Sequence, residues 1–186
     1  MNPIGNKKNL DKIIEELRES ANSYLLKYSS TKQQLRTYLF KKILKKNKIL
    51  TAKKEILNLI DIIIVDLEKN NFISDKHYSD SRSRSYLKRG YSLNKIRQRL
   101  INKGIDKKYV QLSLSKIKDT ETDPDFFSAI KMCKKRRIGP IREESNRSLF
   151  YKKDMGVLAR SGFNYELSKK ILDMPKVEFF NIIKFI

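Results

Sequence analysis

The chain has 186 residues, of which 42 are Lys or Arg and 21 are Asp or Glu, so its formal net charge is +21. This excess of positive charge predicts a polyanionic partner and disfavours an ordinary near-neutral enzyme. Hydrophobic residues make up 39% of the chain, which is enough for a packed core, so the charge does not predict disorder. With only 6 Gly and 4 Pro, the composition favours long helices over a sandwich or a glycine-rich nucleotide fold.

The rarity of cysteine and histidine limits the chemistry of the chain. A single cysteine, Cys133, excludes an internal disulfide and fits a reducing compartment, so we expect a cytoplasmic protein. Because the single histidine, His77, lies in a polar segment, we interpret Cys133 as a small core residue and not as a nucleophile. The sequence predicts no metal site and no cofactor. The most apolar stretch, 56–67, is too short for a membrane span and contains two aspartates.

Apolar residues recur every three or four positions along most of the chain, which predicts helices. The first helix is expected over residues 11–28, the second has Leu35, Leu39 and Ile43 on its buried face, and the third ends near residue 69. Gly90 and Gly104 are expected to end helices, and Ser92 to begin one. The remaining helices are expected over 75–89, 93–103, from 106 onward, 126–137 and 145–161.

One short pattern occurs twice. Segments 100–106 and 158–164 both read Leu, three residues, Gly, an apolar residue and Asp or Asn, and they are 58 residues apart. Any two capped helix junctions share some of this pattern, but here each copy also joins two amphipathic helices, which favours repeated helical modules. The predicted divisions are a helix start at 1–19, three-helix modules at 20–73, 74–118 and 124–175, an acidic linker at 119–123 and a final helix at 176–186.

The basic residues are unevenly distributed. Segments 31–54 and 81–105 contain no Asp or Glu, and a third basic cluster lies before Gly139 and Pro140. Cations without acidic neighbours on their own helix repel one another until a polyanion binds, so we expect these segments to contact phosphates. Helical spacing places Lys95, Arg99 and Lys103 on one exposed stripe. The alternative is a merely solvated surface or a compositional bias towards lysine. The candidate contact residues are Arg82, Arg84, Lys88, Arg89, Lys95, Arg97, Arg99, Lys103, Lys134, Lys135, Arg136 and Arg137.

Several short motifs together resemble one protein family. They are Tyr24-Leu-Leu, Leu35-Arg-Thr-Tyr-Leu, Asp75-Lys-His-Tyr78-Ser, Gly90, Ile96-Arg-Gln-Arg-Leu100, Lys103-Gly104-Ile105 and Leu158-Ala-Arg-Ser-Gly162-Phe163-Asn-Tyr-Glu-Leu. This combination is similar to the RecX recombination regulators over most of residues 20–175. The chain departs from the family pattern at Tyr78-Ser79, usually Phe-Ala, at Tyr91-Ser92, often Lys-Gly, and at Arg99, often glutamate.

The resemblance implies an all-α protein of tandem three-helix modules in an elongated, curved arrangement. It also implies a non-enzymatic regulator that lies in the groove of the RecA–DNA nucleoprotein filament and modulates recombinase activity, chiefly by inhibition, in recombination, DNA repair and the SOS response. The implied partners are the RecA-type filament and single- and double-stranded DNA, with no membrane, and the implied working form is a monomer.

Two other function classes are open at this point. A stand-alone DNA-binding protein of the transcription-regulator type would use the helix at 93–103 in a major groove, with Asn94, Gln98 and Asn102 facing bases. An enzyme such as a nuclease would need paired carboxylates, a phosphate-binding loop or a catalytic triad, and none stands out in the sequence.

Overall fold

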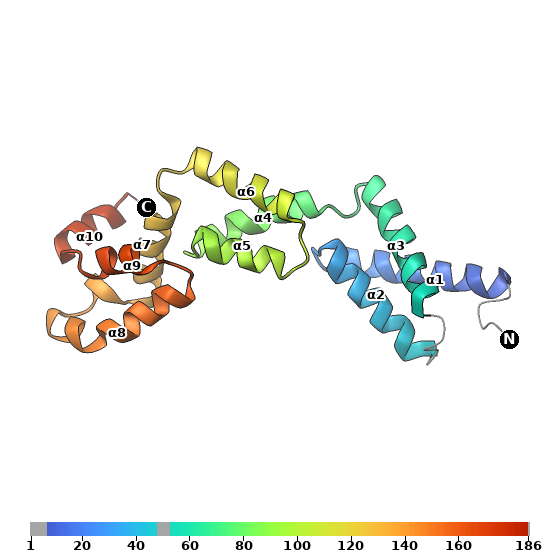
Figure 1. The fold of residues 1–186 in the computed structure, drawn as a ribbon, viewed down its shortest axis with the longest axis horizontal. Helices are drawn as coiled ribbons and strands as arrows, with labels where there is room; N and C mark the ends of the chain where they lie inside the picture. Colours follow the sequence, from blue (N-terminus) through green and yellow to red (C-terminus); the bar gives the residue numbers. More distant parts are fainter. Residues whose placement is uncertain (1–6, 48–52, 186) are drawn as a thin grey trace. The chain divides into compact units, whose positions relative to one another are not determined.

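The computed structural model describes residues 7–47 and 53–185, and within them the chain forms α-helices, one 3₁₀ turn and no β-strand (Figure 1). The all-α class is therefore confirmed. The helices are α1 (Lys7–Lys27), α2 (Lys32–Asn47), α3 (Lys53–Lys69), α4 (Asp75–Lys88), α5 (Leu93–Ile101), α6 (Lys107–Thr120), α7 (Pro124–Arg136), α8 (Glu144–Arg160), α9 (Tyr165–Leu172) and α10 (Lys176–Ile183), with η1 (Gly139–Ile141) before α8.

The chain divides into two compact units. The first unit contains the residues up to Tyr78 together with Lys103–Asp106. The second unit contains Ser79–Asn102 and the residues from Lys107 onward. The three modules expected at 20–73, 74–118 and 124–175 stay a prediction, because a division into compact units does not test how many repeats built them.

The first unit is a packed group of three helices, α1, α2 and α3, which contact one another in pairs. Its core contains Leu17, Leu35, Leu39 and Ile60, each 1% exposed or less. At about 25 cal/mol per Å², burying one such aliphatic side chain contributes roughly 1.5–3 kcal/mol, so this core outweighs any single surface contact.

Helix α3 has apolar residues on its exposed side as well as on its buried side. Ile60 and Ile63 on its inner side are buried, whereas Ile62 and Val65 are 63% and 49% exposed. The most apolar stretch of the sequence, 56–67, therefore lies in this helix, and part of its apolar surface faces outward.

The second unit has its core among α7, α8, α9 and α10. Ile130, Leu158, Ile171 and Phe179 are fully buried there. Cys133 belongs to the same core, and burial, with Asp154 nearby, raises the pKa of its thiol to about 12. Its interpretation as a core residue is confirmed, and a thiol with a raised pKa carries little of the reactive thiolate at neutral pH.

The predicted helix ends are confirmed at the glycines. Gly90, Gly104 and Gly162 have φ values of +80°, +78° and +92°, a left-handed conformation that glycine adopts without steric cost. Ser92 caps α5 by accepting a hydrogen bond from the Lys95 N–H at 3.1 Å. Some helix boundaries differ from the predicted ones by a few residues. Helix α1 begins at Lys7 and not at residue 11, and α5 ends at Ile101 and not at residue 103. Residues 1–6 of the expected N-terminal segment lie outside the described part.

Within the described residues, no helix combines the length and apolarity that crossing a membrane requires.

Candidate nucleic-acid interface

The cations of α4 and the following turn are the first group of predicted contact residues. Arg84 and Lys88 are one helical turn apart on α4 and both are exposed, as is Arg89 in the turn after the helix. Arg82 is half-buried and interacts with other groups of the protein, so it is a less available contact residue. Three of these four cations are thus available to a partner.

Helix α5 corrects one prediction. Its inner face contains Leu93, Ile96 and Leu100, as expected, and Arg97 is exposed. Arg99, however, is half-buried: its guanidinium carbon lies 4.4 Å from the centre of the Tyr91 ring and 5.3 Å from that of Tyr86. Its Nε is buried and has no hydrogen-bond partner among the described residues.

The predicted stripe of Lys95, Arg99 and Lys103 is therefore wrong in two respects. Arg99 packs on aromatic faces, a contact that holds α5 to neighbouring structure and leaves less of the guanidinium for phosphate. Lys103 lies beyond the end of α5 and belongs to the first unit, so helical spacing does not apply to it. Lys95 remains a half-buried lysine near the start of α5.

The third group lies at the C-terminal end of α7. Lys134, Lys135 and Arg136 occupy the last turn and are exposed, and Arg137 follows with φ +54°. Cations at this end of a helix also interact favourably with its dipole, so part of their role is local stabilisation. None of the four forms an ion pair with any described residue.

The two acid-free segments behave differently in the fold. Lys32 binds Glu68 of α3 at 2.9 Å, and the Arg36 guanidinium binds Asp61 through two hydrogen bonds of 2.6 and 2.8 Å. The expectation that these cations lack acidic partners is therefore wrong for Lys32 and Arg36, because α3 supplies carboxylates from elsewhere in the sequence. The part of that segment at residues 48–52 lies outside the described residues.

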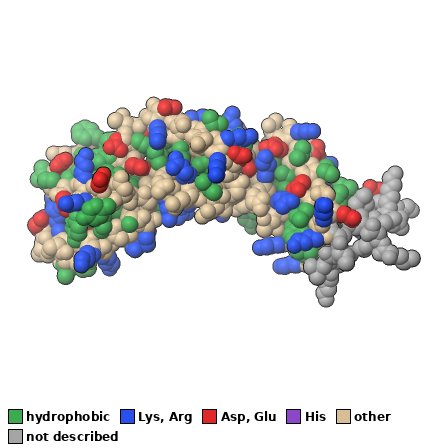
Figure 2. Space-filling view, viewed as in Figure 1, with side chains coloured by type: hydrophobic (Ala, Val, Ile, Leu, Met, Phe, Trp, Pro, Cys, Tyr) green, Lys and Arg blue, Asp and Glu red, His purple; other side chains and the backbone are tan. Residues whose placement is uncertain are grey.

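In the second unit the predicted contact residues form no close ion pair, although Arg84 lies near enough to Asp80 to help lower the pKa of that carboxyl. Apart from Arg82, none forms an ion pair with any described residue. Figure 2 shows Lys and Arg side chains on the visible face of the molecule, interspersed with acidic ones. We call the following nine residues the second-unit cations: Arg84, Lys88, Arg89, Lys95, Arg97, Lys134, Lys135, Arg136 and Arg137.

The sequence reasoning missed an aromatic cluster in the first unit. The rings of Tyr24 and Tyr38 stack with centroids 4.2 Å apart, and Tyr28 lies 5.0 Å from Tyr24. Tyr28 is 57% exposed, and the Lys42 ammonium lies 5.9 Å from the Tyr38 ring. The spacing of Tyr24, in α1, and Tyr28, just after it, was a local signal for the first contact. The contact between Tyr24 and Tyr38 joins α1 to α2 and had no local signal.

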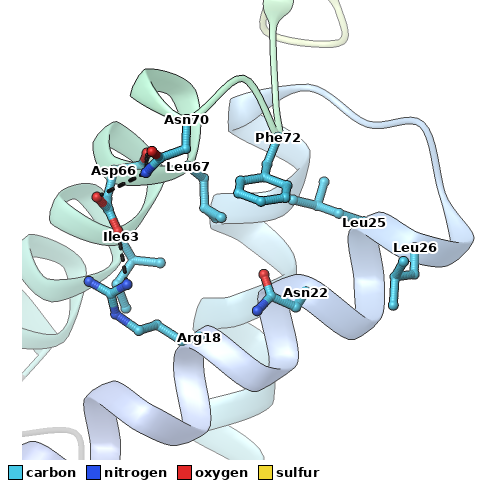
Figure 3. Close-up of a pocket in the computed structure, with 9 residues that line it drawn as sticks. All are labelled: Arg18, Asn22, Leu25, Leu26, Ile63, Asp66, Leu67, Asn70 and Phe72. Atoms are coloured by element: carbon cyan, nitrogen blue, oxygen red, sulfur yellow. Dashed lines mark hydrogen bonds and ion pairs between the residues drawn. The ribbon is translucent and has the colours of Figure 1, made fainter.

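The first unit also contains a pocket of about 410 Å³ between α1 and α3 (Figure 3). One side is polar: Asp66 accepts hydrogen bonds from Arg18 at 2.8 Å and from the side chain of Asn70. The other side is apolar and includes Leu25 and Phe72, whose ring is 67% exposed. A pocket of this composition suits an apolar side chain better than a phosphate.

Comparison with known proteins shows the family. The chain is 28% identical over 160 residues to the regulatory protein RecX of Myxococcus xanthus strain DK1622, covering 84% of both chains. It is 30% identical over 125 residues to the regulatory protein RecX of Shewanella oneidensis strain MR-1, covering 61% of this chain and 94% of that protein. The chain belongs to the RecX family.

Solved structures agree with this assignment at the level of the fold. A crystal structure of regulatory protein RecX matches with a TM-score of 0.62 and 20% identity, covering 91% of this chain and 80% of that one. A crystal structure of RecX from Lactobacillus salivarius matches with a TM-score of 0.58 and 19% identity, covering 88% and 98%. No protein-family model matches the chain. The RecX relatives are named regulatory proteins, so the chain belongs to a family of regulators.

Proposed function

We propose that this chain regulates a RecA-type recombinase by binding the nucleoprotein filament on DNA and lowering its activity, in recombination and DNA repair. Membership in a family named for regulation supports a regulatory role. The observation that carries the binding mode is the set of second-unit cations, whose charge is not neutralised by an ion pair with any described residue. Phosphates and acidic protein surface would neutralise it in a filament.

The proposed contact residues are the twelve predicted from the sequence, with two changes of role. Arg99 acts mainly by packing on Tyr86 and Tyr91, and Arg82 contributes less because it already interacts within the protein. In this proposal the protein acts by binding and not by catalysis, as a monomer in the cytoplasm, and contacts both single- and double-stranded DNA.

The direct test adds the purified protein to preformed RecA filaments and follows ATP hydrolysis and filament length. We expect both to fall with increasing protein concentration. No change in either would contradict the proposal.

A matched pair of variants tests the residues. Replacing Arg84, Lys88 and Arg97 with Glu should weaken filament binding and flatten its dependence on salt, by about 0.9 in log-log slope for each duplex phosphate that is no longer neutralised. The control replaces three exposed lysines outside the proposed set with Glu: Lys152, Lys169 and Lys176. Equally weakened binding in both triple variants would show that only net charge matters and would remove the named residues from the interface.

A second candidate is a stand-alone DNA-binding protein. Asn94 and Gln98 are exposed on α5, where they could face base edges. A footprint on one defined duplex sequence without recombinase would favour this function. Binding that is indifferent to sequence would favour the filament regulator.

A further inference from the structure

The N-terminus of α2 is held by a specific set of contacts within the first unit. Thr31 caps the helix by accepting from the Gln34 N–H at 3.1 Å, and its hydroxyl donates to the Lys103 carbonyl at 2.7 Å. The next amide, the Lys32 N–H, donates to the Asp75 carboxylate at 2.9 Å. Gly104 lies so close to the Gln33 side chain that a Cβ at this position would clash with it. We call this arrangement the first joint.

The N-terminus of α5 is held in the same way within the second unit. Ser92 caps the helix, and its own N–H donates to the Ser161 carbonyl at 3.2 Å. The next amide, the Leu93 N–H, donates to the Asp125 carboxylate at 2.7 Å. A Cβ on Gly162 would clash with the side chains of Ser92 and Lys95. We call this arrangement the second joint.

The two joints correspond part by part. In each, a hydroxyl residue caps a helix, the following amide binds an aspartate from the first turn of a later helix, and a left-handed glycine closes on the same helix end. The glycines are those of the repeated sequence pattern, Gly104 and Gly162. A chance resemblance of two turns does not account for an aspartate in the same role at both places, because Asp75 and Asp125 lie outside that pattern.

The aspartates occupy costly positions. Asp75 is 4% exposed and Asp125 is half-buried, and burial raises the pKa of both carboxyls. Such groups are retained where hydrogen bonds to the charged form repay part of the lost hydration. The partly positive N-terminal ends of α2 and α5 supply these bonds through Lys32 and Leu93.

The second joint lies at the N-terminus of α5, the helix that contains the candidate contact residues Lys95 and Arg97. Asp125 binds the first residue of α5, and Lys95 and Arg97 follow two and four positions later. We propose that Asp125 is a positioning residue that fixes α5, and with it Lys95 and Arg97, for binding to a polyanionic filament, and that Asp75 is its structural equivalent at α2. The part concerning the filament rests on the proposed function above.

The test of the joint needs only the free protein. Amide hydrogen exchange, followed by NMR, should show that Asp125→Ala accelerates exchange at Leu93 by roughly tenfold, because a hydrogen bond to a charged acceptor is removed. Asp125→Asn keeps an acceptor and should restore most of the protection. Asp119→Ala removes the same charge from an exposed position and should change nothing at Leu93. An unchanged exchange rate at Leu93 in Asp125→Ala would contradict the inference that Asp125 holds the N-terminus of α5. If that variant fails to fold, Asp125→Ser, with a shorter acceptor, replaces it.

The test of positioning uses the same variants at a temperature where all are folded. Asp125→Ala should bind RecA filaments about tenfold more weakly, as expected when one well-formed interaction with the filament is removed, and Asp125→Asn should bind nearly as the unaltered protein does. Faster exchange at Leu93 with unchanged filament affinity would overturn the positioning role. If the unaltered protein does not bind filaments at all, the proposed function fails together with positioning, and the exchange measurement alone still decides the joint.

The equivalence of the two joints is tested by Asp75→Ala. This variant should accelerate exchange at Lys32 and leave Leu93 protected, because each joint is closed by its own aspartate. Protection of Lys32 that survives the substitution would show that the two aspartates are not equivalent.

Discussion

Two basic segments that look alike in the sequence have different surroundings in the structure. Both 31–54 and 81–105 lack acidic residues. In the first unit, α3 places Glu68 and Asp61 against Lys32 and Arg36, whereas the cations of the second segment, apart from Arg82, have no ion-pair partner among the described residues. An acid-free window in a sequence therefore does not establish an unpaired surface, because the neutralising groups can come from another helix.

The largest expected effect comes from breaking a pair that is buried. The Arg142 guanidinium binds Asp154 through two hydrogen bonds of 2.7 and 2.8 Å, and the Asp154 side chain is 2% exposed. Arg142→Ala leaves that carboxylate buried beside the Gly139 N–H, which still donates to it, so the free energy of unfolding should fall by about 3 kcal/mol. Urea denaturation measures it. A decrease in the free energy of unfolding of less than about 1 kcal/mol would show that this pair contributes no more than an exposed ion pair does.

The next largest effect is a loss of filament affinity when cations without an ion pair are reversed in charge. Reversing Arg84, Lys88 and Arg97 should lower filament affinity by roughly tenfold or more at low salt and change the free energy of unfolding by less than about 0.5 kcal/mol, because these exposed residues form no ion pair with the described part of the fold. Binding titrations at several salt concentrations and urea denaturation give the two values. A stability loss as large as the binding loss would mean that these residues are structural.

Arg36→Ala should lower the free energy of unfolding and leave filament affinity unchanged. Its ion pair with Asp61 is about one third to one half exposed, so removing it should cost only about 0.5–1 kcal/mol of unfolding free energy. Filament affinity should stay unchanged, since this cation is already neutralised. A clear loss of affinity would add α2 to the proposed contact residues.

The smallest effects concern pH and have opposite signs at two aspartates. Burial alone would raise the pKa of Asp80, but hydrogen bonds from Lys116 and Ser113 leave it below its ordinary value. Asp80 therefore stabilises the fold above an ordinary aspartate pKa of about 4, and this contribution is lost on acidification. For Asp125 the pKa is raised, so its ionisation costs stability as the pH rises through that range.

Two isosteric variants test these signs. Between about pH 3 and pH 7, the free energy of unfolding of Asp80→Asn should fall relative to that of the unaltered protein as the pH rises, and that of Asp125→Asn should rise relative to it. Denaturation series across this range measure both. Parallel curves for the two variants would contradict the assigned directions.

Much of the fold was predictable because its signals are local. Apolar spacing predicted the helices, and Gly90, Gly104 and Gly162 marked their ends, since left-handed backbone is costly for other residues. The role of Cys133 also followed from composition. The position of Arg99 was not predictable from spacing alone, because Tyr86 of α4 and Tyr91 of the following turn come together with α5 only in the folded chain.

By itself, the sequence determined the helical class, the strong positive charge and the resemblance to RecX proteins, since composition, periodicity and motifs are properties of neighbouring residues. Only the tertiary structure decided which cations are neutralised and which aspartates close the two joints. These depend on residues far apart in the chain, such as Arg36 with Asp61 and Leu93 with Asp125. Their contacts form only when packing brings the helices together, and no local pattern encodes them.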